Sequence, residues 1–406
     1  MIRMRPALVW LFVVATLSFP AALAGTTRVW TREGIALRAG TFDDMMLSPE
    51  GQLVPGARSA ELARPETALV WDVLLVGESA LVATGEGSGL WRYSVDARAP
   101  KPPELIAGLT EEPDVFALER DRRGRVYAAT GPRGAVFQID VAQGRAEELF
   151  RPEAEYIWAL AALPDGGLLV ATGLPGAVWK LDPDRPGSAR MMWDSSESHV
   201  RCLAVRRDGS VLAGTADSGW LVAIDESGGG FVLHDSERPE TVAVVETEDG
   251  ALWAAFAGSV SRADANGQPG AKPNDAPGSM TINVRANAGD KGNDEKDDEK
   301  KAKARPSREL PGGGGAVVRL APADAAVEVW SDGRETPNAL LARGDEVLLA
   351  TSGEGRVWWF DGDGKAGWWL VRRDAQAISA LDADARRTVI GASNPAVLLL
   401  RDGEPA

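Results

Sequence analysis

Short apolar runs separated by turn residues fill the chain from residue 65 to residue 403. Runs of this kind, bounded by Gly, Asp, Pro and Ser, predict β-strands. One strand-turn-strand phrase recurs at Arg123–Asp140, Gly166–Asp182 and Gly209–Asp225, with spacings of 42 and 43 residues between equivalent glycines. The repeats contain no helical stretch. Self-similarity at this period predicts a repeat architecture in which each unit is one supersecondary element.

Each repeat contains four strand-like runs, which predicts the four-stranded antiparallel blade of a β-propeller. Such units over residues 65–403 predict an all-β fold with seven blades. The second strand of a blade is apolar almost throughout, as in Leu168–Ala171, because both of its faces should pack on neighbouring blades. The innermost strands are expected at Val70–Leu75, Val115–Glu119, Ile157–Leu163, Val200–Arg206, Thr241–Glu246, Ala339–Arg343 and Ile378–Asp382.

The last blade offers only three strands, so we expect the N-terminal segment, residues 25–64, to supply a fourth strand that closes the ring. Candidate strands in this segment are Thr27–Thr31 and Met45–Pro55. Closure matters because an open edge strand exposes unpaired backbone groups and favours aggregation.

Two turn positions recur. The glycines that follow the second strands should allow positive φ where the hairpin reverses, and the aspartates that follow the third strands should accept hydrogen bonds from the backbone of their own turns. The pairs that carry the glycine are Thr84-Gly85, Thr130-Gly131, Thr172-Gly173 and Ser352-Gly353. The aspartates are Asp140, Asp182, Asp225 and Asp361.

Blade five is interrupted at residues 263–314 by Gly, Pro, Asn and charged residues. The part Asp290–Lys303 is nearly pure Asp, Glu and Lys, and it cannot bury enough apolar surface to offset its ordering entropy. We therefore expect a disordered, charged insertion in one hairpin of blade five, either a passive insert or a binding segment.

The first residues have the pattern of a secretory signal peptide. Arg3 and Arg5 precede an apolar run, and an A-x-A site predicts cleavage between Ala24 and Gly25. Residues 1–24 are therefore expected to be removed, leaving a periplasmic or secreted protein with no membrane span.

The formal net charge is −15, and loss of Arg3 and Arg5 would make it more negative by two. Such a surface repels nucleic acid and anionic lipid. The chain holds one cysteine, Cys202, which cannot form an internal disulfide and is expected to be a small buried apolar residue.

The run Tyr156–Leu160 followed by Pro164–Gly173 resembles the repeats of bacterial propellers of the two-component-regulator type and of the broader WD40-like and NHL-like superfamily. The resemblance extends over most of residues 65–403. The sequence lacks the Gly-His and regular Trp-Asp dipeptides of WD40 blades. The resemblance implies a propeller that presents a binding face, and a fold alone does not imply an activity.

Residues just before the innermost strands should surround one mouth of the channel. They give a mixed polar rim that could hold a small polar ligand or a divalent cation, or could be ordinary solvated turns. The candidates are Asp114, Glu155, Tyr156, His199, Glu240, Asn338 and Gln376.

No catalytic motif is present, and only two histidines occur, His199 and His234. His234 is expected at the outer edge, which disfavours a two-histidine metal site. The favoured hypothesis is an exported, monomeric, non-catalytic propeller, without cofactor, that acts as a binding or scaffold module for an envelope or extracellular protein or a small ligand. The alternatives are a metal-dependent hydrolase or lyase of the lactonase or streptogramin-lyase kind, with His199 as a base, and a component of an envelope assembly.

Overall fold

The computed structural model describes residues 45–47, 52–55, 59–86, 89–96, 101–106, 109, 114–258, 314–322, 324–371 and 375–402. The chain divides into two units, Met1–Thr41 and Phe42–Ala406, and every described residue belongs to the second. All regular elements in these residues are β-strands, and none of the described residues forms a helix long and apolar enough to cross a membrane. The expected signal peptide, its cleavage site at Ala24 and Gly25, and the insertion up to residue 313 lie outside the described residues.

Successive strands form antiparallel four-stranded meanders. The first comprises β4 (Val70–Val76), β5 (Ser79–Thr84), β6 (Leu90–Ser94) and β7 (Glu104–Ile106). The next two comprise β8 (Asp114–Arg120), β9 (Val126–Gly131), β10 (Val136–Asp140) and β11 (Arg145–Phe150), then β12 (Tyr156–Ala162), β13 (Leu168–Gly173), β14 (Ala177–Leu181) and β15 (Arg190–Asp194).

The later meanders follow the same order. They comprise β16 (His199–Val205), β17 (Val211–Ala216), β18 (Trp220–Ile224) and β19 (Gly230–Asp235), then β20 (Glu240–Glu246), β21 (Leu252–Ala257), β22 (Gly315–Leu320) and β23 (Val327–Asp332), then β24 (Thr336–Arg343), β25 (Glu346–Ser352), β26 (Arg356–Phe360) and β27 (Ala366–Val371). The chain then forms β28 (Ala377–Ala383), β29 (Arg387–Ser393) and β30 (Val397–Asp402).

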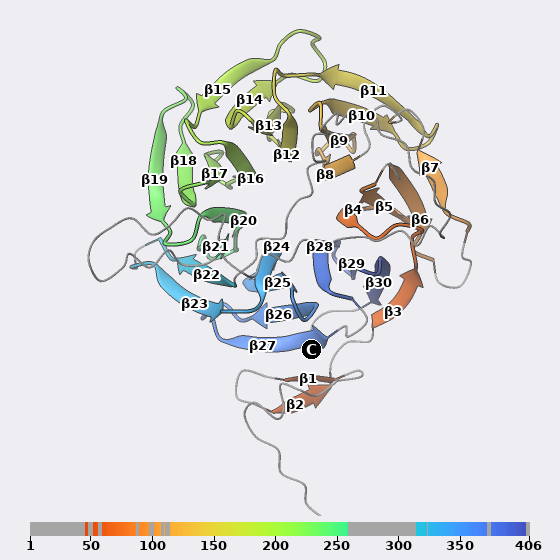
Figure 1. Ribbon diagram of the computed structural model, residues 1–406, viewed down its shortest axis with the longest axis vertical. Helices are drawn as coiled ribbons and strands as arrows, with labels where there is room; N and C mark the ends of the chain where they lie inside the picture. Colours follow the sequence, from red (N-terminus) through yellow and green to blue (C-terminus); the bar gives the residue numbers. More distant parts are fainter. Residues whose placement is uncertain are drawn as a thin grey trace, which may run out of the picture. The chain divides into compact units, whose positions relative to one another are not determined.

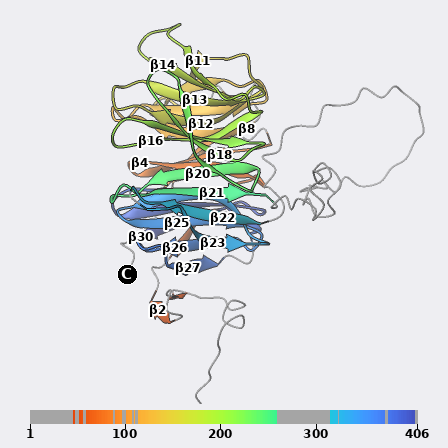
Figure 2. The same ribbon diagram turned by 90° about the vertical axis from the view of Figure 1, so that its left-hand side faces the viewer.

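The sheets are arranged around a common centre, with the first strand of each meander innermost (Figure 1). The innermost strands are β4, β8, β12, β16, β20, β24 and β28. Seen from the side, neighbouring sheets pack face against face (Figure 2).

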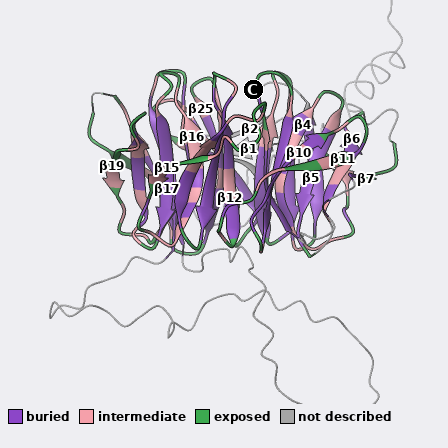
Figure 3. Ribbon diagram, turned by 90° about the horizontal axis from the view of Figure 1, so that it is seen from above, coloured by how far each residue is buried: buried purple, intermediate pink, exposed green. Residues whose placement is uncertain are grey.

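The apolar core lies between neighbouring sheets. Leu81 of β5, for example, packs with Val115 of β8 and Phe137 of β10. Every residue of the second strands β9, β13, β17 and β21 is buried. Burial is greatest in the middle of the sheets, whereas exposed residues gather in loops and on outer strands (Figure 3). The expectation that second strands pack on both faces is confirmed.

The strand that pairs with β30 is β3 (Ser59–Ala63), with Ala60 opposite Leu400 and Ala63 opposite Leu398. It lies within the segment 25–64 but outside both candidate strands. Residues Met45–Leu47 and Leu53–Pro55 instead form a separate hairpin, β1 and β2, in which Leu47 pairs with Trp368 of β27. The choice of Met45–Pro55 was therefore wrong, and Thr27–Thr31 lies outside the described residues. Leu62 and Ala63 explain why β3 pairs with β30, because both residues pack on the apolar cluster that contains Leu398 and Leu400.

The first sheet packs directly against the last. The Val70 amide donates to Ser393 Oγ at 3.0 Å, and the Leu75 amide donates to Asp382 Oδ2 at 2.6 Å. Apolar residues of β4 and β5 share one buried cluster with residues of β28, β29 and β30. Residues more than 300 positions apart in sequence are thus brought into contact.

The recurring turn glycines have a different role from the one expected. Of the four, only Gly353 has a positive φ, at 101°. At Gly131 a Cβ atom would come within 2.6 Å of the Phe116 ring, and at Gly173 it would clash with both Trp158 Nε1 and His199 Nδ1. At these two positions glycine makes room for aromatic side chains of the innermost strands.

The recurring aspartates behave as expected. Asp225 Oδ1 accepts hydrogen bonds from the Ser227 and Gly229 amides at 2.8 and 2.9 Å. Asp361 Oδ1 accepts from the Asp363 and Lys365 amides at 3.1 and 2.8 Å. Each carboxylate therefore satisfies backbone donors of its own turn, which explains why aspartate recurs there.

Removal of residues 263–313, with a short Gly-Ser linker in their place, is expected to shift the melting temperature by no more than a few degrees. β21 and β22 form a complete ladder from Leu252–Leu320 to Ala257–Gly315, and the Gly258 amide donates to the Gly314 carbonyl at 3.1 Å. Gly314, the last residue of the expected insertion, has a φ of 88° and takes part in this hairpin. Shortening a loop changes its closure free energy by only about 0.6 kcal/mol per halving. A large loss in a calorimetric melt would contradict the prediction.

Candidate functional site

Every innermost strand of the described sheets carries a β-bulge near its start. A bulge inserts one residue that has no partner on the neighbouring strand and re-aims its side chain. The bulge residues are Trp71, Phe116, Trp158, Arg201, Val242, Asn338 and Ser379. All of them line one central cavity of about 310 Å³.

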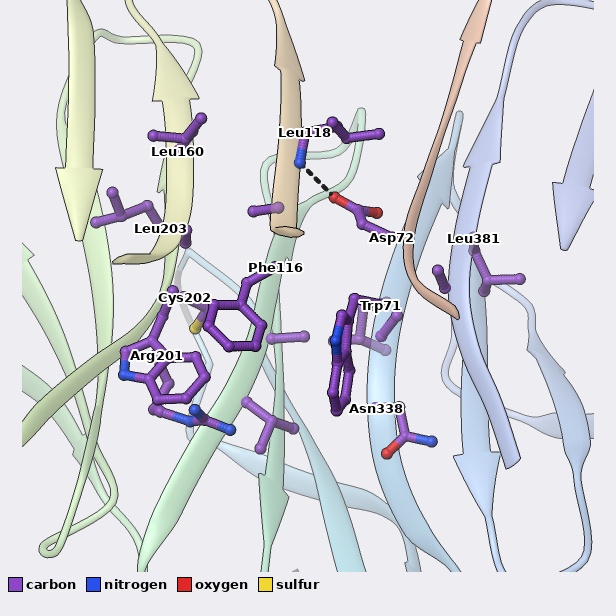
Figure 4. A pocket seen from close by; sticks show the side chains of 18 of the residues that line it. Trp71, Asp72, Phe116, Leu118, Leu160, Arg201, Cys202, Leu203, Asn338 and Leu381 are labelled. Carbon is purple, nitrogen blue, oxygen red and sulfur yellow. Dashed lines mark hydrogen bonds between the residues drawn. The ribbon is translucent and has the colours of Figure 1, made fainter. Parts of the chain in front are cut away.

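The wall of this central cavity is chemically asymmetric. The bulge residues of β4, β8 and β12 are aromatic, whereas those of β20, β24 and β28 are a valine, an asparagine and a serine. The ring centres of Trp71 and Phe116 are 5.7 Å apart, and those of Phe116 and Trp158 are 5.0 Å apart. Trp71, Phe116 and Arg201 extend toward the same space from their strands (Figure 4). One side of the cavity is thus an aromatic surface.

Arg201 is the cation of the central cavity. Its guanidinium carbon lies 4.1 Å from the centre of the Trp158 ring, and its Nε lies 3.5 Å from Glu240 Oε1. The side chain is only 7% exposed. Within the described residues, Arg201 Nε and Glu240 Oε2 have no hydrogen-bond partner. Buried polar groups are normally hydrogen-bonded. Arg201 Nε can therefore still donate a hydrogen bond, and Glu240 Oε2 can still accept one, beside the aromatic surface.

His199 is held by Trp158. The indole Nε1 donates to His199 Nδ1 at 3.0 Å, so the proton of the neutral imidazole is on Nε2. Burial, followed by the positive charge of Arg201, lowers the pKa of His199 below its usual value. His199 Nδ1 is therefore occupied as an acceptor and orients the Trp158 ring.

The expected rim residues divide into three sets. Four residues have equivalent positions in their sheets, because each begins an innermost strand and pairs with the last residue of the second strand. They are Asp114, Tyr156, His199 and Glu240. Glu155 and Gln376 lie one residue earlier, and both are exposed. Asn338 is the third residue of β24 and is a bulge residue that lines the cavity.

Several rim residues have structural partners. Asp114 is buried, and its Oδ1 accepts a hydrogen bond from the Glu86 amide at 2.9 Å. The Asn338 side-chain amide donates to the Ile378 carbonyl at 2.7 Å. Tyr156 packs on Phe116 of the neighbouring strand β8 with ring centres 6.4 Å apart. These contacts join neighbouring sheets, so Asp114, Asn338 and Tyr156 each have a structural role.

Among the described residues, no group of three or more His, Cys, Asp and Glu side chains could hold a metal ion. Cys202 is buried, with its Sγ 3.6 Å from the Thr241 carbonyl, as expected. His234 lies on the outer strand β19 and packs on Phe256 with ring centres 5.1 Å apart.

Carboxylates join neighbouring sheets further along the innermost strands. Asp72 Oδ2 accepts from the Leu118 amide at 2.8 Å (Figure 4), and Glu119 Oε1 accepts from the Ala162 amide at 3.1 Å. Burial, with the nearby charges of Asp72 and Asp382, raises the pKa of Glu119 to about 7. Burial also raises the pKa of Asp382 to about 6.

Glu119→Gln is expected to make folding stability less dependent on pH. A buried carboxyl with a raised pKa binds its proton more tightly in the folded state, so its stabilising effect is complete below about 4.5 and is lost as pH rises to about 7. At pH 8 the variant should be more stable than the wild type by about 3 kcal/mol, because glutamine is neutral and its carbonyl can still accept from Ala162. Urea unfolding at pH 5 and pH 8 measures the difference. Glu147→Gln, on an exposed position of β11, is the matched control, and equal pH dependence of all three proteins would contradict the prediction.

Apart from Asn338, the bulge residues were not among the candidates expected from the sequence. The signal was present, because the alternation of apolar residues in each innermost strand slips by one residue at the bulge. Val115 and Leu118 pack in one cluster and Ala117 in another. Likewise, Ile157 and Leu160 pack in one cluster and Ala159 packs against another.

The sequence matches no protein-family model and no curated protein. Solved structures do match. Virginiamycin B lyase from Staphylococcus aureus aligns with a TM-score of 0.60 at 12% identity, over 85% of this chain and 98% of its own. The extracellular domain of a hybrid two-component system from B. thetaiotaomicron aligns with a TM-score of 0.59 at 11% identity, over 87% of this chain and 44% of its own.

A third structure, YCF48 bound to D1 peptide, aligns with a TM-score of 0.55 at 12% identity, over 86% of this chain and 98% of its own. At such low identity these likenesses describe the fold and not the activity. They agree with the repeats, the antiparallel meanders and the resemblance found in the sequence. The chain has the β-propeller fold.

Proposed function

We propose that this chain is a non-catalytic β-propeller that binds a small molecule or a peptide in its central cavity. The observation that carries the proposal is the convergence of all bulge residues on one space, with an aromatic surface on one side and the buried Arg201–Glu240 pair beside it. Ligand sites are concave and mainly apolar, with a few polar groups that fix orientation. The central cavity has this composition.

The architecture that supports the site is a ring of seven blades. The last blade consists of β28, β29, β30 and the N-terminal strand β3, so the ring closes through pairing of β3 with β30. The contacts of β4 with Ser393 and Asp382 support this closure. A closed ring holds the innermost strands at fixed positions, which favours a pre-formed site.

The protein is proposed to act outside the cytoplasm, as a monomer with an envelope or extracellular partner. The support is the signal-peptide pattern of residues 1–24 and the fold shared with an extracellular domain. N-terminal sequencing of the exported protein should give a start at Gly25. Retention of residues 1–24 in the exported protein would contradict this part of the proposal.

Val242→Trp gives a direct test of the binding site. It places on β20 the residue type that β4 and β12 carry at the bulge, so it should fill the cavity from the opposite wall while the strand keeps its geometry. A ligand-observed NMR screen of a mixed fragment library should give hits for the wild type that the variant no longer binds. Hits that bind both proteins equally would contradict the cavity as the binding site.

The alternative of a metal-dependent hydrolase or lyase rests on the fold shared with virginiamycin B lyase. Calorimetric titration of the protein with Ca²⁺, Mg²⁺ and Zn²⁺ separates the two proposals. Binding of one of these ions that is lost in His199→Ala with Glu240→Gln would favour the metal-dependent enzyme. A binding module needs none of the three.

A further inference from the structure

The geometry points to an aromatic residue of a peptide as the ligand of the central cavity, with its ring against Trp71 and Phe116 and a neutral main-chain carbonyl at Arg201. The inference rests on the proposed function and specifies the class of ligand. Four observations carry it: the cavity volume, the aromatic surface, the bonding capacity of Arg201, and the charges around that side chain.

The volume limits the size of the group that enters. About 310 Å³ is near the lower end of ligand sites, which begin at roughly 300 Å³. The space suits one ring-bearing group with a few further atoms and excludes an oligosaccharide or a folded segment. A longer ligand must therefore place one side chain in the cavity and leave the rest of its chain outside.

The aromatic surface selects a ring for this position. Trp71 and Phe116 meet at an interplanar angle of 63°, and Phe116 and Trp158 at 38°. Aromatic rings attract one another in tilted and edge-to-face arrangements, with about 0.5–1.5 kcal/mol per pair beyond the area buried. A ligand ring in the cavity would continue the series of tilted pairs that the wall already contains.

Arg201 supplies a hydrogen-bond donor next to the ring position. The guanidinium stacks on Trp158 at 4.1 Å, and Trp158 packs on Phe116 with ring centres 5.0 Å apart. Arg201, Trp158 and Phe116 line the same cavity. One amino-acid residue whose ring lies in this cavity can therefore place its main-chain carbonyl toward the guanidinium.

The charges near Arg201 favour a neutral acceptor. Glu240 already pairs with Arg201, and Glu155 and Asp217 also act on the neighbouring His199. A ligand carboxylate would be repelled by these acidic side chains, and a ligand cation would be repelled by Arg201 itself. An amide carbonyl accepts from the guanidinium without either cost.

Binding of N-acetyl-L-tryptophanamide, measured by ligand-observed NMR titration, tests the inference. The two comparators are N-acetyl-L-tryptophan, which has the ring and a carboxylate, and N-acetyl-L-leucinamide, which has the amide without a ring. The wild type should bind the tryptophanamide at least tenfold more tightly than either comparator. Equal affinity for the acid and the amide, or for the leucine and tryptophan amides, would overturn the inference.

Arg201→Met keeps the length of the side chain and removes its donors, and it should weaken binding of the tryptophanamide by at least tenfold. Arg206→Met is the matched control, since Arg206 follows the same strand and pairs with Glu246 instead. The control should bind within twofold of the wild type. Melting curves and circular dichroism of both variants show that the fold is retained, and unchanged binding by a folded Arg201→Met protein would overturn the inference.

The outcome also separates this inference from the proposed function. If none of the aromatic amides binds but other fragments are lost in Val242→Trp, the peptide inference fails and the binding module stands. If no fragment depends on the cavity, both fail.

Discussion

A chain that begins at residue 65 is expected to lose roughly 4 kcal/mol of folding stability and to melt about 6 °C lower than one that begins at residue 57. The two chains differ by β3, whose residues pair with Leu398, Leu399, Leu400 and Arg401 of β30. Without β3 the ladder hydrogen bonds of this edge are lost, each worth about 1 kcal/mol. The side chains of Leu398, Leu399 and Leu400, all buried in the complete protein, also lose part of their cover.

The chain from residue 57 is the control because it lacks β1 and β2 but retains β3. A second variant strengthens the test: residues 59–64 are attached after Asp402 through a short Gly linker. Ser59 lies opposite Arg401, so the attached strand can turn back directly onto β30. Thermal melts should show recovery of most of the lost stability. Equal melting temperatures for the chains from residues 57 and 65 would contradict closure of the ring by β3.

Glu335→Ala is expected to destabilise the protein by about 3–5 kcal/mol. Glu335 is only 1% exposed, lies between β23 and β24, and forms an ion pair with Arg356. Its Oε2 also accepts from Thr351 Oγ1 at 2.7 Å and from Trp358 Nε1 at 2.9 Å. Loss of the carboxylate leaves several buried donors without their acceptor, and such groups bear the full cost of lost hydration.

Glu354→Ala is the matched control, because Glu354 pairs with the same arginine from a side chain that is 45% exposed. Exposed pairs contribute at most about 1 kcal/mol, so this variant should melt close to the wild type. Glu335→Leu combined with Arg356→Leu should lose less stability than Glu335→Ala alone, since neither partner then remains buried and uncompensated. Denaturant unfolding measures all three variants, and a small effect of Glu335→Ala would show that the network is not a major support of the fold.

The repeat pattern of the sequence predicted much of the local structure. Expected innermost strands such as Val200–Arg206 and Thr241–Glu246 agree closely with β16 and β20, because apolar runs between turn residues depend mainly on nearby sequence. The aspartate turns were also predictable, since a carboxylate that bonds to the backbone two to four residues onward needs no distant partner.

The candidate site was predicted less well. His199, Tyr156 and Glu240 were expected just before innermost strands and are the first residues of β16, β12 and β20. Their neighbours across the ring were not visible in the sequence. Asn338 was aligned with them although it is a bulge residue. A bulge shifts the register by one position, and no turn residue marks that shift.

By itself, the sequence determined the strand content, the four-strand repeat, the buried second strands and the aspartate turns, because each of these follows from local chain chemistry. The tertiary structure decided which N-terminal strand pairs with β30, which glycines make room for rings, and that Trp71, Phe116, Trp158 and Arg201 meet in one cavity. Those outcomes depend on contacts between residues that belong to different sheets. Such contacts exist only when the sheets are assembled around a common centre, so no single segment of the chain encodes them.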